Sequence, residues 1–141
     1  MFKQFVLPLA AVILAALLPQ VSTAEDLQKI LKLVEEDKAL LLDLREKVEW
    51  NKGHLESAQL TSFSQFALEK QVKKIVAGLP PADEKQIFLY CQNGRMAQIG
   101  ANILKKHGAN VTPLKAGYTQ LLAAGFEKAG SKREPDKRGF R

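Results

Sequence analysis

The chain has 141 residues, a formal net charge of +6 and a single cysteine. This length fits one domain with one core, and one cysteine excludes an intramolecular disulfide. Residues 131–141, which read SKREPDKRGFR, carry much of the positive charge and lack apolar periodicity. We therefore expect a flexible, solvated basic tail and no folded nucleic-acid surface, with weak attraction to anionic lipids or polyanions as the second interpretation.

Residues 1–24 have the build of a secretory signal peptide, with one positive charge at Lys3, an uncharged run over residues 5–18 and a small residue, Ala24, at the end. The uncharged run is shorter than the roughly 20 residues that a membrane-spanning helix needs, and it contains Pro8. This favours cleavage near Ala24 over retention as an anchor. We expect a periplasmic or otherwise exported protein without a stable membrane anchor after cleavage.

Helices are indicated where apolar residues recur at intervals of three and four, and the first such pattern begins at Glu25. Further helices are predicted over residues 63–79, from about residue 95 to residues 107–108, and over residues 118–124. Glycine or proline follows each of these three segments, as is usual beyond a helix end.

Short apolar runs of the length of buried strands lie at residues 39–44, 86–90 and 110–114. The connection after residue 44 is polar and broken at Gly53, with a short edge strand expected within residues 55–60. Strands that alternate with helices indicate an α/β fold, a parallel sheet with helices on both faces. Ligands of such sheets bind beyond the carboxyl ends of the strands.

Cys91 lies directly at such a strand end, and the segment from Gln92 through Asn93 and Gly94 to Arg95 leads into a helix. Gly94 permits a positive φ, so backbone N–H groups of the loop can turn toward one point. A helix N-terminus and a nearby arginine both favour an anion, and we expect them to stabilise a Cys91 thiolate. The alternative is a buried cysteine acting as a small hydrophobe, which is the commoner fate of a lone cysteine.

Several segments in register resemble the single-domain rhodaneses, a family of sulfurtransferases. The loop CQNGR at residues 91–95 is similar to their active-site loop, and LLDLRE at residues 41–46 to their strand followed by an Asp-x-Arg-Glu turn. GHL at residues 53–55 and the strand, glycine turn and helix of residues 114–125 also match. The resemblance covers about residues 40–126 and, with the leader, is most similar to the small periplasmic rhodaneses of the phage-shock type.

This resemblance implies a rhodanese-like domain over residues 25–130, followed by the basic flexible tail 131–141. It implies that Cys91 is the catalytic residue, and that Asp43 and Arg45 are structural support near the site. The substrate-binding residues that it implies are those of the loop and the helix start: Gln92, Asn93, Gly94, Arg95 and Met96.

The implied reaction is a double displacement without a cofactor or metal. Cys91 takes sulfane sulfur from a small anionic donor such as thiosulfate and passes it, as a persulfide, to a thiophilic acceptor, cyanide or a thiol. The alternative is a non-catalytic persulfide carrier or sulfur-binding module that serves a partner protein. A Cys-x5-Arg phosphatase is disfavoured because Ala97 occupies the position of the arginine.

We also expect a solitary exposed thiol, open to intermolecular disulfide formation and over-oxidation.

Overall fold

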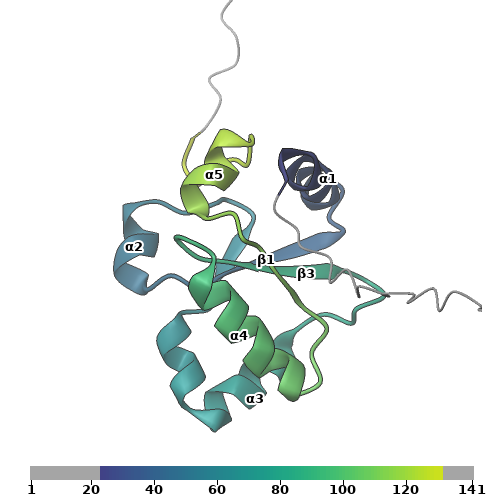
Figure 1. Ribbon diagram of the computed structural model, residues 1–141, viewed down its shortest axis with the longest axis vertical. Coiled ribbons are helices and arrows are strands. Elements are labelled where there is room, and N and C mark those ends of the chain that lie inside the picture. The colour runs from purple at the N-terminus through teal and green to yellow at the C-terminus, as the bar shows by residue number, and fades with distance from the viewer. Residues whose placement is uncertain (1–22, 132–141) are drawn as a thin grey trace, which may run out of the picture.

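The computed structural model describes residues 23–131, so the tail from residue 132 and the leader up to residue 22 lie outside the described residues (Figure 1). No helix within residues 23–131 is long and apolar enough to cross a membrane. In chain order, the elements are α1 (Ala24–Glu35), β1 (Ala39–Asp43), α2 (Lys47–Lys52), β2 (Ala58–Leu60), the 3-10 helix η1 (Phe63–Ala67), α3 (Glu69–Gly78), β3 (Gln86–Tyr90), α4 (Arg95–Lys106), β4 (Thr112–Pro113) and α5 (Tyr118–Ala123).

The four strands form one parallel sheet with the order β2-β1-β3-β4. The two central strands, β1 and β3, are the continuous apolar runs of the sequence, as expected for strands covered on both faces. Their register pairs Ala39 with Gln86 and Asp43 with Tyr90. Both strands therefore end at the same edge of the sheet, where the cysteine follows Tyr90.

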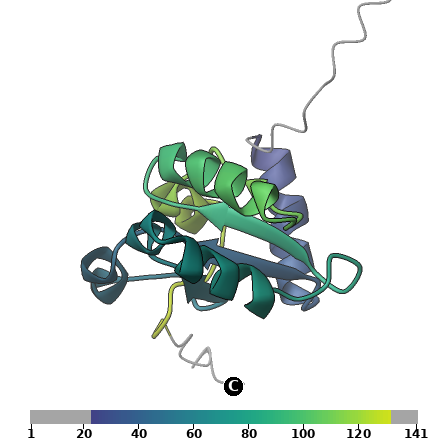
Figure 2. The same cartoon turned by 90° about the horizontal axis from the view of Figure 1, so that it is seen from below.

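Helices cover both faces of this sheet and confirm the predicted α/β fold. In Figure 1, α1 and α5 lie on one side of the sheet and α3 and α4 on the other. Figure 2 views the molecule from the α3 and α4 side, where these two helices run next to each other. Successive side chains of β1 point to opposite faces of the sheet. Leu41 lies in the core beneath α1 and α5, and Leu42 lies in the core beneath α3 and α4.

The helix predicted over residues 63–79 is broken into two parts, η1 and α3. Leu68 between them has an extended backbone, with φ −115° and ψ 117°. The extended residue resets the direction of the chain, so that Phe66 of η1 and Val72 of α3 both enter the core beneath α4. The apolar spacing continues across the break, which is why the pattern predicted a single helix.

Helix α2 was not predicted, because the polar connection after residue 44 shows no apolar periodicity and α2 has no buried residue. A local signal exists: the Glu49 carboxylate accepts the N–H of Glu46 at 3.2 Å, as in one half of a capping box. The strand within residues 55–60 begins only at Ala58. β4 is also shorter than predicted and spans Thr112–Pro113, although the Leu114 N–H still donates to the Leu89 carbonyl at 2.8 Å.

Candidate functional site

The cysteine loop joins β3 to α4 at the carboxyl edge of the sheet, as predicted. Cys91 follows the last residue of β3, and Gly94 is the N-cap of α4. Gly94 has φ +84°, a left-handed conformation that glycine adopts without strain. Figure 1 places the start of α4 and helix α2 at the same end of the sheet. The loop is therefore a tight turn that leads directly into a helix N-terminus.

The sulfur of Cys91 is buried, and only 1% of the residue is exposed. Its Sγ accepts the backbone N–H of Gly94 at 3.1 Å, and the thiol lies 4.0 Å from the Asn93 Oδ1. The expectation of an exposed thiol is therefore wrong, because Cys91 packs in the core with α4 residues such as Ala97. Burial leaves little of the residue open to solvent, while the Gly94 N–H supplies one hydrogen-bond donor to the sulfur.

The other predicted loop residues are mostly exposed to solvent. Gln92, Asn93 and Arg95 are exposed, and Met96 is 44% exposed. The N–H of Arg95 donates to the Asn93 Oδ1 at 3.1 Å rather than to the sulfur. The structure thus brings all five predicted residues to one loop and helix start, with the Gly94 N–H directed at the sulfur and the Arg95 N–H held by a side chain.

Asp43 and Arg45 form a buried ion pair next to the loop. The Arg45 Nη2 lies 2.8 Å from the Asp43 Oδ2, and the Nε is 3.1 Å from both carboxylate oxygens. Burial acts to lower the pKa of Arg45, but the hydrogen bond and charge of Asp43 outweigh it and raise the pKa above its ordinary value. Arg45 therefore stays charged, and its Nη2 also donates to the Gly53 carbonyl at 2.8 Å.

Two tyrosines that the sequence analysis did not place in the site complete this network. The Tyr90 hydroxyl donates to the Asp43 Oδ2 at 2.8 Å, and burial, followed by the charge of Asp43, raises the pKa of Tyr90 so that it remains a donor. The Tyr118 ring lies 3.9 Å beneath the Arg45 guanidinium. Tyr90 could have been inferred from the paired strand ends, whereas Tyr118 approaches from a distant segment and left no local signal.

The histidines lie apart from the sulfur chemistry. The His54 Nδ1 is 3.1 Å from the Trp50 carbonyl oxygen, and the two rings stack with centroids 3.6 Å apart. The His107 Nδ1 is 3.1 Å from the Ile103 carbonyl oxygen at the end of α4. Within the described part of the chain, no group of three or more His, Cys, Asp or Glu side chains could hold a metal ion.

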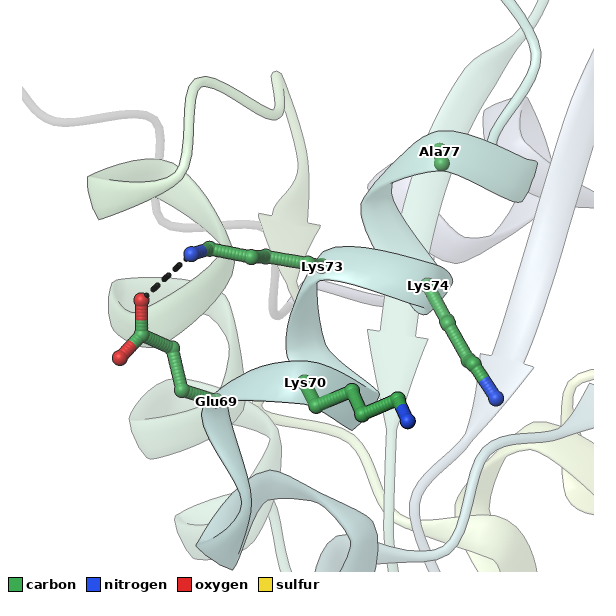
Figure 3. Close-up of a pocket in the computed structure, with 5 residues that line it drawn as sticks. All are labelled: Glu69, Lys70, Lys73, Lys74 and Ala77. Atoms are coloured by element: carbon green, nitrogen blue, oxygen red, sulfur yellow. Dashed lines mark ion pairs between the residues drawn. The ribbon is translucent and has the colours of Figure 1, made fainter.

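A shallow groove on the outer side of α3 is a separate concave surface, lined by Glu69, Lys70, Lys73, Lys74 and Ala77. Figure 3 shows Lys73 reaching Glu69, an ion pair of 2.8 Å, while Lys70 and Lys74 project to the other side. None of the predicted site residues lines this groove. Its lysines instead provide exposed positive charges remote in sequence from the loop, which are useful as controls.

The matches to known proteins agree with this fold. The rhodanese-like domain model matches residues 24–124, so the chain belongs to the rhodanese-like domain family. The chain is 32% identical over 99 residues to the uncharacterized protein YqhL of Bacillus subtilis (strain 168), across 64% of this chain and 72% of YqhL.

Solved structures share the fold at lower identity. The rhodanese-like domain of the Alr3790 protein from Anabaena sp. is 20% identical, with a TM-score of 0.61, over 87% of this chain and 89% of that one. The human single-domain sulfurtransferase TSTD1 is 19% identical, with a TM-score of 0.57, over 74% of this chain and 96% of that one.

Proposed function

We propose that this protein is a sulfurtransferase in which Cys91 accepts and releases sulfane sulfur. One observation carries the proposal: the Gly94 N–H, at the N-terminus of α4, donates to the Cys91 Sγ at 3.1 Å. A cysteine thiolate is the nucleophile in such chemistry, and a helix N-terminus with inward N–H groups stabilises negative charge on sulfur. A cysteine that served only as a core hydrophobe would not require a positive-φ glycine to aim a donor at it.

The first half-reaction takes sulfur from thiosulfate. The Cys91 thiolate attacks the outer, sulfane sulfur, the S–S bond of the donor breaks, and its electron pair leaves with sulfite. Cys91 then carries a persulfide. In the second half-reaction cyanide attacks the terminal sulfur, forms thiocyanate and regenerates the thiolate; a thiol acceptor would instead leave as a hydropersulfide, its own proton passing to the products. No net oxidant or reductant is consumed in either case.

The loop and the start of α4 would stabilise the negative charge on the reacting sulfur and on the donor. The Gly94 N–H already points at the sulfur, and the first N–H groups of α4 have no carbonyl partner one turn earlier. Asn93 holds the Arg95 N–H, so its side chain has to rotate before that N–H can bind an oxygen of the donor. The exposed Arg95 guanidinium would bind the anionic end of thiosulfate and the departing sulfite.

We further propose that this chemistry takes place outside the cytoplasm, as in the phage-shock-type rhodaneses that the sequence resembles. The support is the leader-like composition of residues 1–24. Expression of the full chain in a bacterium, followed by fractionation and N-terminal sequencing, tests it. A periplasmic protein beginning at Glu25 is expected, and a cytoplasmic protein that retains residue 1 would contradict the proposal.

Steady-state formation of thiocyanate from thiosulfate and cyanide tests the catalytic proposal. Turnover by the wild-type protein that disappears in Cys91→Ser is the expected result. If free thiosulfate gives no turnover but Cys91 accepts sulfur from a persulfidated protein, the carrier function replaces the enzymatic one. If Cys91 accepts sulfur from neither source, the proposed function is wrong.

A further inference from the structure

Residues 115–118, which lead from β4 into the first residue of α5, pack against the cysteine loop at two glycines. A Cβ atom at Gly94 would lie 2.7 Å from the Lys115 carbonyl oxygen, and one at Gly117 would lie still closer to the Gln92 carbonyl oxygen. Both separations are too short for any real side chain. The two backbones are therefore in direct contact at two points. Gly94 of the cysteine loop lies against Lys115, and Gly117 lies against Gln92 of the loop.

Hydrogen bonds hold the same contact. The Tyr118 N–H donates to the Cys91 carbonyl at 3.0 Å, while the Gly117 N–H donates to the Gln120 Oε1 at 2.8 Å within the same turn. The Tyr118 ring also packs beneath Arg45, which is held in turn by Asp43. Residues 115–118 are thus fixed to the buried ion pair on one side and to the cysteine loop on the other.

This contact determines which way the N–H groups of the loop point. The carbonyls of Cys91 and Gln92 both face residues 117–118. In a trans peptide the N–H points opposite to the carbonyl of the same unit, so the N–H groups of Gln92 and Asn93 point away from that segment. The Cys91 side chain belongs to the core beneath α4, whereas Tyr118 packs against the core on the opposite face of the sheet.

We propose that residues 115–118 position the cysteine loop for sulfur transfer, with Gly117 as the positioning residue. The inference rests on the proposed function, because it assigns Gly117 a role in directing N–H groups toward the transferred sulfur. Gly117 has φ −91° and ψ 179°, an extended conformation open to any residue. Glycine is needed there for space, and a methyl group at that position has to displace the Gln92 carbonyl.

Gly117→Ala is the direct test, with Gly78→Ala as its matched control. A Cβ at Gly78, the last residue of α3, has no heavy atom within 4 Å. Because a displacement of about 1 Å in a catalytic site can lower the rate about 100-fold, we expect Gly117→Ala to lose at least about 10-fold in kcat with thiosulfate and cyanide. Gly78→Ala should keep the wild-type kcat. A folded Gly117→Ala variant with kcat and KM within about twofold of wild type would overturn the inference, since a purely structural role shifts the thermal midpoint alone.

If Gly117→Ala fails to fold, a second pair of variants, at Tyr118, tests the positioning role. Tyr118 is the first residue of α5, a position that tolerates proline, and the extended Gly117 suits the residue before a proline. Tyr118→Pro and Tyr118→Ala both lose the ring over which Arg45 lies. Only the proline variant loses the N–H to the Cys91 carbonyl. A lower kcat in Tyr118→Pro than in Tyr118→Ala is expected, and equal values would overturn the inference.

Failure of the proposed function would be visible separately, as absence of sulfur transfer in the wild-type protein. The rate at which iodoacetamide alkylates Cys91 then tests positioning without a sulfur donor. A rate in Gly117→Ala that differs from the rates of wild type and Gly78→Ala would support the positioning role. Equal rates in all three proteins would overturn it.

Discussion

The two central strands end in polar sites of opposite kinds. At the end of β1, the Asp43 carboxylate accepts hydrogen bonds from the guanidinium and backbone N–H of Arg45 and from the hydroxyl of Tyr90. One residue beyond the paired end of β3, the Cys91 sulfur receives one N–H, from Gly94, within residues 23–131. A hydrogen-bonded buried network rigidifies its surroundings, whereas a group with few hydrogen bonds can gain more when a ligand arrives. The first site is built as a scaffold, and the second is the one for which we propose chemistry.

Replacing the sulfur should have the largest effect on activity and little effect on the fold. In Cys91→Ser, the hydroxyl preserves the shape of the buried side chain but is a far poorer acceptor of sulfane sulfur. Thiocyanate formation should fall by at least about 1,000-fold, the scale seen when a nucleophile is removed, while the circular-dichroism spectrum stays unchanged. Retained turnover would remove Cys91 from the mechanism.

Breaking the scaffold should have the largest effect on stability. Asp43→Asn removes the charge that compensates the buried Arg45, and loss of one partner of a buried ion pair typically costs about 3–5 kcal/mol. Denaturant unfolding measures the change. Glu69→Gln breaks the exposed ion pair with Lys73 on α3 and should leave the unfolding midpoint unchanged. Equal midpoints in the two variants would show that the pair at the end of β1 is not a scaffold.

Removing the exposed Arg95 guanidinium should have an intermediate effect, confined to anionic donors. In Arg95→Ala, kcat/KM for thiosulfate should fall by about 10-fold to 100-fold, corresponding to one charge-assisted hydrogen bond. Alkylation of Cys91 by neutral iodoacetamide should change much less. Lys70→Ala removes an equal charge from the α3 groove, which no predicted site residue lines, and should change neither rate. An equal loss in both variants would indicate a general effect of net charge.

The smallest expected effect comes from a third polar site, the cap of α1. The Thr23 Oγ1 accepts the Asp26 N–H at 3.1 Å, and cleavage after Ala24 would remove this cap. A chain that begins at Glu25 should be about 1 kcal/mol less stable than one that begins at Ser22, by thermal unfolding. Thr23→Ala in the longer chain removes the cap without creating a new terminal amine at Glu25, so it measures the contribution of the cap alone. No difference among the three would show that the cap contributes nothing to the domain.

The strands and the position of the cysteine were predictable because they depend on local patterns. Buried parallel strands appear as continuous apolar runs, and Gly94 before a helical pattern identifies a turn at the end of β3. The six-residue helix α2 has no buried face, so it leaves no periodicity. The break at Leu68 was hidden because apolar spacing continues through it.

The burial of the sulfur and the aiming of its loop could not be inferred from local pattern. Burial of the sulfur depends on packing with α4 residues such as Ala97, and the orientation of the loop depends on Gly117 and Tyr118, which follow β4 beside β3. The size of the ion-pair network was likewise hidden, because Tyr90 and Tyr118 join Asp43 and Arg45 from separate elements. Tertiary contacts of this kind have no period in the sequence.

Intact-mass spectrometry of the reduced protein, before and after incubation with thiosulfate, tests the central claim most directly. The account predicts a gain of about 32 Da, one sulfur atom, that maps to Cys91 and disappears when cyanide is added. An unchanged mass, with Cys91 still open to alkylation, would contradict the claim that thiosulfate loads this cysteine with sulfur.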